Sequence, residues 1–374
     1  MPRSGPLHPV SLSLLALLLA LPQRAEAQIP LEAPLPVDAA VTIGELDNGL
    51  KYYIRQNSRP ENRTELRLVV NAGSVLEDET QLGLAHLVEH MAFNGTENFE
   101  KQELVDYLQS IGMAFGPSIN AGTSFDETSY ILSGVPTDDP EIIATAFQIL
   151  EDWAHLVSFE PEEIDKERGV VIEEWRGSRG AGARIFDAQL PIMFKDSRYA
   201  ERLPIGTVEV LQNFPHEELT RFYDTWYRPD LMAVVAVGDF DPVEIEQLIQ
   251  MHFNRLAVPD TPLDRPYYGV PDHAETYYAL ASDPEATGSQ IAVLAMQDPK
   301  TVTTVGDYRG SLIESLVSRM MNNRFQELAQ QADPPFVGAG TGRGSFVRTK
   351  SVFQLAAAVA EDGHERGLEA LLIE

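Results

Sequence analysis

The chain has 374 residues, 44% of them hydrophobic, which is enough to bury sizeable cores in two domains of ordinary size. Its 57 Asp and Glu residues against 28 Lys and Arg argue against binding to nucleic acid or to an anionic membrane. We interpret the acidic excess as a solubilising surface rather than a preference for basic substrates. No cysteine is present, which excludes disulfides, thiol nucleophiles and cysteine-ligated zinc, so any metal must be held by histidines and carboxylates.

The first 27 residues have the pattern of a signal peptide. Arg3 precedes an apolar core at residues 10–21, and Ala25-Glu26-Ala27 forms a small-x-small cleavage site. The core is shorter than the run of about 20 apolar residues that a membrane anchor requires, and no other segment is expected to span a membrane. We therefore expect cleavage near Ala27 and an exported protein, either periplasmic or secreted.

Residues 28–40 are proline-rich and predict an extended arm before a first domain at residues 41–257. The periodicity predicts strands at residues 41–55 (two, with a hairpin turn at 47–49), 66–71, 118–133 and 233–237. It predicts helices that begin at Gly83 and Pro140, and further helices at residues 100–111, 161–176 and 243–253. Strands and helices are thus mixed within one domain.

A second domain is expected after a linker at residues 258–275, which is marked by prolines and a tyrosine pair. Residues 276–374 predict strands at 290–296 and 351–360 and a helix at 308–331. Gly338–Gly344 lacks the Gly-Lys-Ser/Thr ending of a phosphate-binding loop, so we predict a flexible turn there. Because the chain stops at Glu374 inside an expected helix, we expect this domain to be incomplete.

The segment His86–His90 carries the strongest chemical signal. Histidines four residues apart lie on one helical face and can share a metal ion, and Glu89 emerges beside them, within reach of a water on that ion. The order His-x-x-Glu-His reverses His-Glu-x-x-His and is the inverzincin pattern. The alternative is a structural helix with two hydrogen-bonded histidines, but the rarity of histidine here and an apolar stripe on the neighbouring face favour a metal site.

A catalytic zinc ion requires a third protein ligand and an open position for water. Four of the other histidines are scattered through the chain without motif spacing and are expected at the surface or core edge: His155, His216, His252 and His273. The acidic helix at residues 161–176 is a better source. Glu167 and Glu174 share a face but lie about 10 Å apart along the axis, so one should bind the metal while the other supports a histidine. The pattern does not choose between them and leaves Glu173 open; a merely solvated acidic face is the alternative for the whole helix.

These residues resemble the pitrilysin/insulinase family of zinc peptidases, which also contains the mitochondrial processing peptidase. The resemblance rests on the segments Gly83–Thr96, Asn120–Thr128, Glu167–Glu174 and Tyr227–Asp230, the last leading into Val237–Asp239. It covers about residues 40–374, and it is very specific in the first domain and weaker in the second.

The resemblance implies a set of roles at one site. One zinc ion per catalytic domain would be held by His86, His90 and Glu174, with Glu89 as the general base and Glu167 supporting a ligand. This implies a zinc-dependent endopeptidase that acts on exported or periplasmic peptides or unfolded proteins. Two alternatives remain: a non-catalytic peptide-binding or assembly subunit of the same family, and a different zinc hydrolase such as a deaminase, which the absence of cysteine ligands disfavours.

The resemblance also implies an α+β fold in which each domain is a mixed β-sheet with helices packed on one face, the second domain lacking the metal motif. The strand around Asn120 and Ala121 would be an edge strand that pairs with the substrate backbone. In the family a second half or a partner subunit closes over the peptide, so we expect the 374 residues to be weakly active by themselves.

Overall fold

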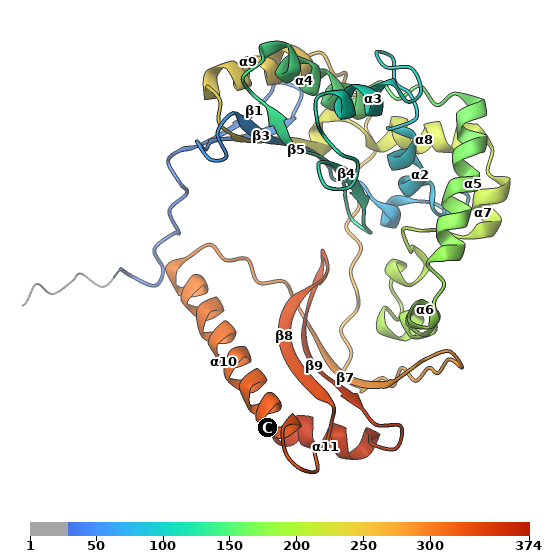
Figure 1. Ribbon diagram of the computed structural model, residues 1–374, viewed down its shortest axis with the longest axis vertical. Helices are drawn as coiled ribbons and strands as arrows, with labels where there is room; N and C mark the ends of the chain where they lie inside the picture. The colour runs from blue at the N-terminus through green and yellow to red at the C-terminus, as the bar shows by residue number, and fades with distance from the viewer. Residues whose placement is uncertain (1–28) are drawn as a thin grey trace, which may run out of the picture. The chain divides into compact units, whose positions relative to one another are not determined.

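The computed structural model describes residues 29–374 (Figure 1). The expected signal peptide, residues 1–27, lies outside this range. Within it, no helix has the length and apolar character needed to cross a bilayer. The chain divides into two compact units, a small one that contains residues 29–36 and 301–317 and a large one that contains residues 37–300 and 318–374.

A six-stranded mixed sheet is the frame of the large unit. Its strands are β1 (Val41–Glu45), β2 (Lys51–Gln56), β3 (Arg63–Val70), β4 (Ile119–Thr123), β5 (Thr128–Pro136) and β6 (Met232–Gly238). They lie in the order β1-β2-β6-β3-β5-β4, with the β2-β6 pair parallel and the other pairs antiparallel. The predicted hairpin at residues 41–55 is confirmed, whereas the predicted strand at 118–133 is a hairpin of two strands. β4 is an edge strand of this sheet.

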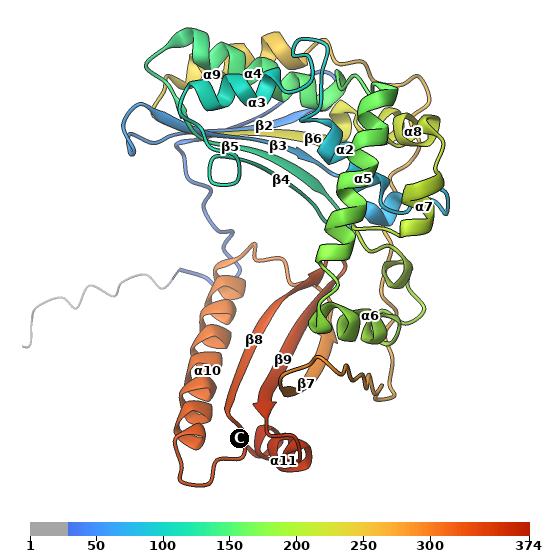
Figure 2. The same cartoon turned by 45° about the vertical axis from the view of Figure 1, so that its right-hand side comes forward.

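Helices cover one face of the sheet (Figure 2). They are α2 (Leu84–Met91), α3 (Glu103–Ser110), α4 (Pro140–His155) and α9 (Pro242–Phe253), of which α4 packs on β5 and α9 on β2. Alternate residues of β3, including Leu66 and Leu68, are fully buried together with Phe147 and Trp153 of α4. This alternation places the apolar side chains of the strand on the helix-covered face. The expected α+β fold, a mixed sheet with helices on one face, is confirmed.

Four more helices follow α4 in the chain: α5 (Pro161–Gly177), α6 (Ala181–Met193), α7 (Val208–Asn213) and α8 (His216–Trp226). Short 3-10 turns lie at Ser74–Leu76, Arg198–Glu201 and Pro229–Leu231. Helices α5 and α8 both pack against α2. The sequence predicted α5 but not α6, which contains Pro191, a residue that normally ends a helix.

A second, three-stranded sheet contains β7 (Ser289–Gln297), β8 (Gly338–Val347) and β9 (Lys350–Val359) in the antiparallel order β7-β9-β8. Helix α11 (His364–Ile373) packs on β7 and β9. The turn predicted at Gly338–Gly344 is wrong, because these residues form most of β8. They pair with β9 from Gly338↔Ala358 to Gly344↔Val352, and such backbone pairing needs no side chain.

The small unit joins the proline-rich arm to the first turns of α10 (Val305–Ala329). The amide of Leu35 donates to the carbonyl of Thr303, and the amide of Gly306 donates to the carbonyl of Leu31. The domain boundaries at residues 40, 257 and 275 stay a prediction from the sequence.

Candidate metal centre

The two histidines of helix α2 lie at the edge of the core because the apolar side chains of the same helix are buried in it. Leu84, Leu87 and Val88 are fully buried, as the apolar stripe in the sequence predicted. The side chains of His86 and His90 keep 14% and 20% of their surface accessible. The histidines are therefore held rigidly at the edge of the core while still open to a ligand.

A buried carboxylate fixes the start of α2. Glu77 is fully buried and accepts hydrogen bonds from the backbone amides of Gly83 (3.0 Å) and Ala85 (2.8 Å), groups that the first helical turn leaves without partners. Burial raises the pKa of Glu77 to about 8, against the opposing effect of these bonds. Gly83 has a φ of 98°, and a Cβ added to Gly206 would lie 2.4 Å from the Gly83 Cα, so the entry to the helix requires two glycines.

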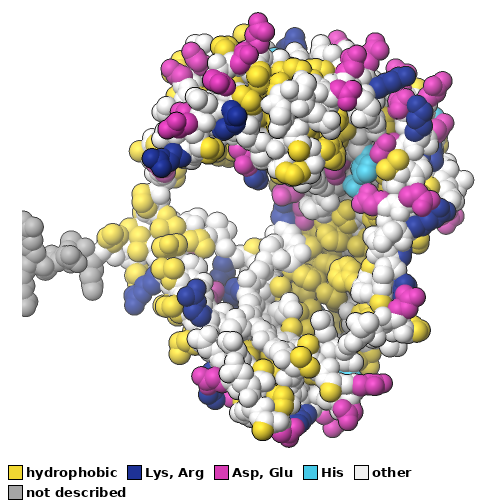
Figure 3. All heavy atoms as spheres, viewed as in Figure 1, with side chains coloured by type: hydrophobic (Ala, Val, Ile, Leu, Met, Phe, Trp, Pro, Cys, Tyr) yellow, Lys and Arg dark blue, Asp and Glu magenta, His cyan; other side chains and the backbone are white. Residues whose placement is uncertain are grey.

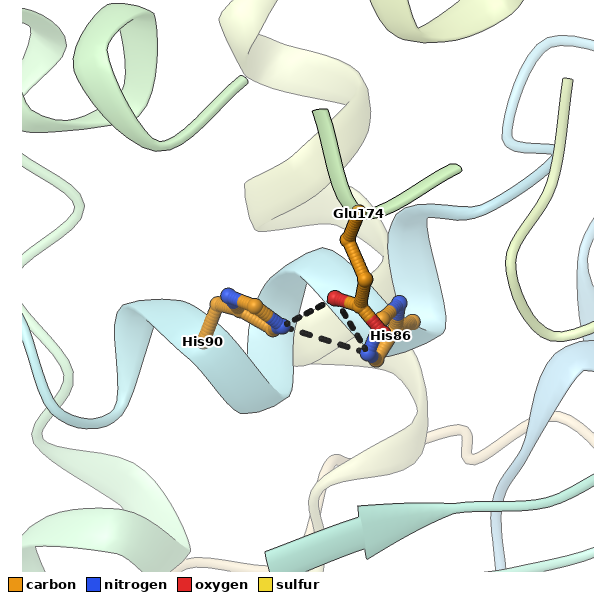
Figure 4. A group of neighbouring side chains, drawn as sticks. All are labelled: His86, His90 and Glu174. Atoms are coloured by element: carbon orange, nitrogen blue, oxygen red, sulfur yellow. Dashed lines mark hydrogen bonds and ion pairs between the residues drawn. The ribbon is translucent and has the colours of Figure 1, made fainter. Parts of the chain in front are cut away.

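Three donor atoms converge beside this helix (Figure 4). The Nε2 atoms of His86 and His90 lie 3.2 Å apart. Glu174 Oε2, from the C-terminal part of α5, lies 3.8 Å from the first and 3.4 Å from the second. Among the residues described, these three are the one group of histidine and acidic side chains whose donor atoms could hold an ion.

The donor set and its spacing fit zinc. Two imidazole nitrogens and a carboxylate oxygen are typical ligands of catalytic zinc, with bond lengths of about 2.0–2.2 Å in tetrahedral geometry. Such a geometry separates neighbouring donor atoms by about 3.3 Å, close to the three distances between the donor atoms of His86, His90 and Glu174. In the space-filling view, histidine side chains reach the surface among acidic ones (Figure 3).

The two imidazoles have different electrostatic environments. Burial, together with the neighbouring His90, lowers the pKa of His86 to about 4, so this ring is neutral as a metal ligand must be. Burial also acts to lower the pKa of His90, but the hydrogen bond to Glu167 and the nearby carboxylates raise it overall. His90 Nδ1 donates to Glu167 Oε1 at 2.7 Å, which turns Nε2 toward the converging donors.

Glu167 is itself held at its second oxygen. Asn94 Nδ2 donates to Glu167 Oε2 at 2.7 Å, and Gln102 Nε2 donates to Asn94 Oδ1 at 3.2 Å. The Glu167 side chain keeps 14% of its surface accessible. A chain of polar groups therefore fixes the orientation of the His90 ring from behind.

The two adjacent glutamates of α5, Glu173 and Glu174, point in different directions. Glu173 forms an ion pair with Arg176, and 70% of its side chain is exposed. Glu174 points to the imidazoles. Of the three glutamates that the sequence left open as the third ligand, Glu174 is the one whose carboxylate lies beside both Nε2 atoms.

The carboxylate of Glu89 lies on the same helix, between the two histidines in sequence. It is 9% exposed, and burial raises its pKa above the ordinary value of 4.5, although a hydrogen bond from Thr123 opposes this. Thr123 Oγ1 donates to Glu89 Oε2 at 2.8 Å.

The strand that carries Asn120 and Ala121 is β4, which pairs with β5 on one side and ends the sheet on the other. Asn120 is exposed and Ala121 is half-buried. Helix α2 packs against β4. The edge strand therefore lies next to α2, the helix that carries two of the three donor atoms.

The scattered histidines do not join this group. His155 and His252 contact Glu151, His216 contacts Asp165, and His273 contacts a backbone carbonyl: the distances are 3.4, 2.7, 2.8 and 2.6 Å, respectively. Each has a local polar partner, as expected for surface and core-edge residues.

Reasoning from the sequence missed three polar residues of the site. Asn94 and Thr123 entered only as members of the segments Gly83–Thr96 and Asn120–Thr128, without a role of their own, and Glu77 was not considered. Glu77 stands six residues before Gly83, outside the positions where helix-capping rules apply. Of the three residues, only Thr123 had a signal in the sequence, because it lies in the polar strand segment that was expected to bind substrate.

Two family models match most of the chain. A model described as Insulinase (Peptidase family M16) matches residues 52–198, and one described as Peptidase M16 inactive domain matches residues 213–332. The chain belongs to the insulinase family of peptidases. The His-x-x-Glu-His segment and Glu174 both lie within the first match.

Curated relatives of this insulinase-family chain are named zinc proteases. It is 42% identical over 294 residues to a zinc protease PQQL-like of Arabidopsis thaliana, covering 78% of this chain and 31% of the relative. It is 33% identical over 317 residues to the probable zinc protease PqqL of Escherichia coli (strain K12), covering 83% and 33%. The chain thus spans about a third of the length of the curated relatives it matches.

Solved structures of the family share its fold. The periplasmic protease PqqL from Escherichia coli has a TM-score of 0.81 at 30% identity, with 91% of this chain and 38% of that chain covered. The first half of the same protease has a TM-score of 0.78 at 28% identity, with 91% and 72% covered. Pitrilysin, at 19% identity and a TM-score of 0.70, shows the same fold.

Proposed function

We propose that the chain carries the metal centre of a zinc-dependent endopeptidase that hydrolyses peptide bonds in exported or periplasmic peptides or unfolded proteins. The observation that carries the proposal is the convergence of two imidazole nitrogens and the Glu174 carboxylate, with the buried carboxylate of Glu89 on the same helix. The family, and the names of relatives as zinc proteases, support it. A periplasmic location is supported by the similarity to PqqL from Escherichia coli, a periplasmic protease.

Each residue of the site has a chemical task in this proposal. His86, His90 and Glu174 hold one zinc ion, which when bound lowers the pKa of a coordinated water and polarises the scissile carbonyl. Glu89 takes a proton from the attacking water and passes it to the leaving amine. Its burial raises its pKa, which makes the carboxylate a stronger base and favours uptake of that proton. Glu167 acts on His90 and keeps its Nε2 directed at the ion.

The substrate binds along β4. A peptide in extended conformation adds as a further strand at the free edge beside Asn120 and Ala121, by backbone hydrogen bonds. Because such bonds are independent of side chains, this mode suits unfolded segments of varied sequence. It also requires the substrate to be locally unfolded, since a folded protein offers few unpaired backbone groups.

We infer that further domains of the same protein, or a partner subunit, contribute to catalysis. The matched relatives are about three times as long as the aligned residues, and closure over a bound peptide would exclude water and align it. The 374 residues by themselves are then slow, and addition of the missing part should raise the rate.

The test is Glu89→Gln, with the exposed Glu173→Gln as its matched control. Zinc content of the purified proteins is measured by mass spectrometry, and cleavage with a library of quenched fluorescent peptides, with and without chelator. We expect Glu89→Gln to keep its zinc and to lose at least about a hundredfold in rate, as for removal of a general base. Cleavage by Glu89→Gln at the normal rate would refute the mechanism. Chelator-resistant cleavage by the unmodified protein would refute the zinc-dependent mechanism. Absent cleavage by the zinc-loaded protein would favour a non-catalytic peptide-binding subunit.

A further inference from the structure

The hydroxyl of Thr123 is the contact that joins the base to the substrate-binding strand. Thr123 is the last residue of β4 and pairs with Thr128, the first residue of β5. Residues at alternate positions of a strand face the same side, so Thr123 shares a face with Ile119, which is fully buried under the helices. This face is the one against which α2 packs.

The direction of the hydrogen bond follows from the acceptors around the hydroxyl. Thr123 Oγ1 lies 2.8 Å from Glu89 Oε2 and 3.4 Å from Thr128 Oγ1. The Thr128 hydroxyl donates its hydrogen to the carbonyl of Ala72 at 3.0 Å, so it cannot also donate to Thr123. An ionised carboxylate can only accept, and the shorter contact therefore takes the single hydrogen of Thr123.

Thr123 is also the one side chain that hydrogen-bonds the Glu89 carboxylate within residues 29–374. A carboxylate on a flexible side chain otherwise samples several rotamers, and fixing one oxygen orients the other. The backbone of Thr123 also hydrogen-bonds this carboxylate, so the hydroxyl adds a second contact that restricts the side chain. A bond of this kind, between a neutral donor and an ionised acceptor, is stronger than a neutral one.

The position of Thr123 gives this contact a second consequence. A peptide added to the free edge of β4 would lie about 4.8 Å from that strand. The same strand would therefore align the peptide through its backbone and the base through the Thr123 hydroxyl.

We propose that Thr123 is a positioning residue, which holds the Glu89 carboxylate at a fixed place relative to a peptide bound along β4. The inference rests on the proposed role of Glu89. Thr123 does not touch the ion or the substrate in this account, and it acts through the geometry of the base. It therefore contributes to the chemical step rather than to peptide binding.

The experiment compares Thr123→Val with Thr123→Ser. Valine keeps the branched shape and the strand preference but removes the hydroxyl, whereas serine keeps the hydroxyl and loses a methyl group. Thr64→Val is the matched control, because Thr64 is a buried threonine of β3 in the same sheet, with its hydroxyl bonded to the carbonyl of Val237. Values of kcat and KM for a fluorogenic peptide, zinc content and thermal stability are measured for each protein.

We expect Thr123→Val to lower kcat by about ten- to a hundredfold with KM within about threefold, as for loss of one hydrogen bond to a charged group. Thr123→Ser and Thr64→Val should both retain kcat within about threefold, and all variants should retain zinc. Normal kcat in Thr123→Val would overturn the inference. So would an equal loss in Thr123→Val and Thr123→Ser, or a loss explained by a raised KM or missing zinc, since these indicate a structural role. Full activity of Glu89→Gln would instead refute the proposed role of Glu89, and with it the proposed function.

Discussion

The buried Glu77 should make the metal-free protein less stable as the pH rises. Its pKa is raised from 4.5 to about 8, so between these values the folded state holds a proton that the unfolded state has lost. Raising the pH therefore favours unfolding. Each pH unit in this interval removes about 1.4 kcal/mol from the free energy of unfolding, up to about 5 kcal/mol across it.

Glu77→Gln separates this effect from the other titrating groups. Glutamine is neutral at every pH, so in this variant the residue at position 77 no longer makes the free energy of unfolding fall as the pH rises. Its amide nitrogen cannot accept a hydrogen bond, and one of the amides of Gly83 and Ala85 loses its partner, at a cost of about 1–3 kcal/mol at all pH values. The wild-type protein should then be the more stable at pH 5 and the less stable at pH 8.

The assay is urea unfolding from pH 5 to 8.5 in the presence of chelator, followed by the fluorescence of Trp153 and the other tryptophans. Chelator is needed because metal binding adds a pH dependence of its own. Glu61→Gln is the control, since Glu61 is exposed, and its stability curve should run parallel to that of the wild type. Parallel curves for Glu77→Gln as well would show that Glu77 is charged throughout, and the reasoning would be refuted.

Two further predictions concern the metal. Glu174→Gln should weaken zinc binding by more than about a hundredfold, whereas Glu173→Gln should leave it within about twofold, because only Glu174 faces the imidazoles. Competition with a chromophoric chelator measures both, and equal losses would contradict the assignment. Asn94→Ala should weaken zinc binding by about tenfold, because Glu167 loses the donor at its second oxygen. Calorimetric titration would test this, and an unchanged affinity would show that His90 and the main chain orient Glu167 sufficiently.

The local chemistry of the site could be predicted from the sequence because it depends on helical spacing. His86 and His90 are four residues apart, and Glu167 and Glu174 are seven apart on one helix, so their shared faces follow from periodicity alone. The same spacing argument led to one carboxylate near the donors and one behind a histidine, which is the arrangement of Glu174 and Glu167 in the structure. The helix at residues 161–176 is confirmed.

Contacts between distant elements could not be predicted in this way. The bond from Thr123 to Glu89 depends on how α2 packs on β4, and periodicity says nothing about such packing. The choice of Glu174 over Glu173 came from a family resemblance, and the rotation of α5 against α2 decides the geometry. For β8 the local signal pointed the wrong way, because glycine has a low strand preference and the pairing with β9 outweighs it.

The donor atoms come from α2 and from the far end of α5, two helices widely separated in the chain and packed side by side. An ion bound by the three donor atoms would cross-link the two helices. Its affinity therefore includes the free energy of packing α5 against α2. Any change that loosens this helix pair weakens metal retention without altering a donor atom. Conversely, bound metal would protect this helix pair against proteolysis and heat.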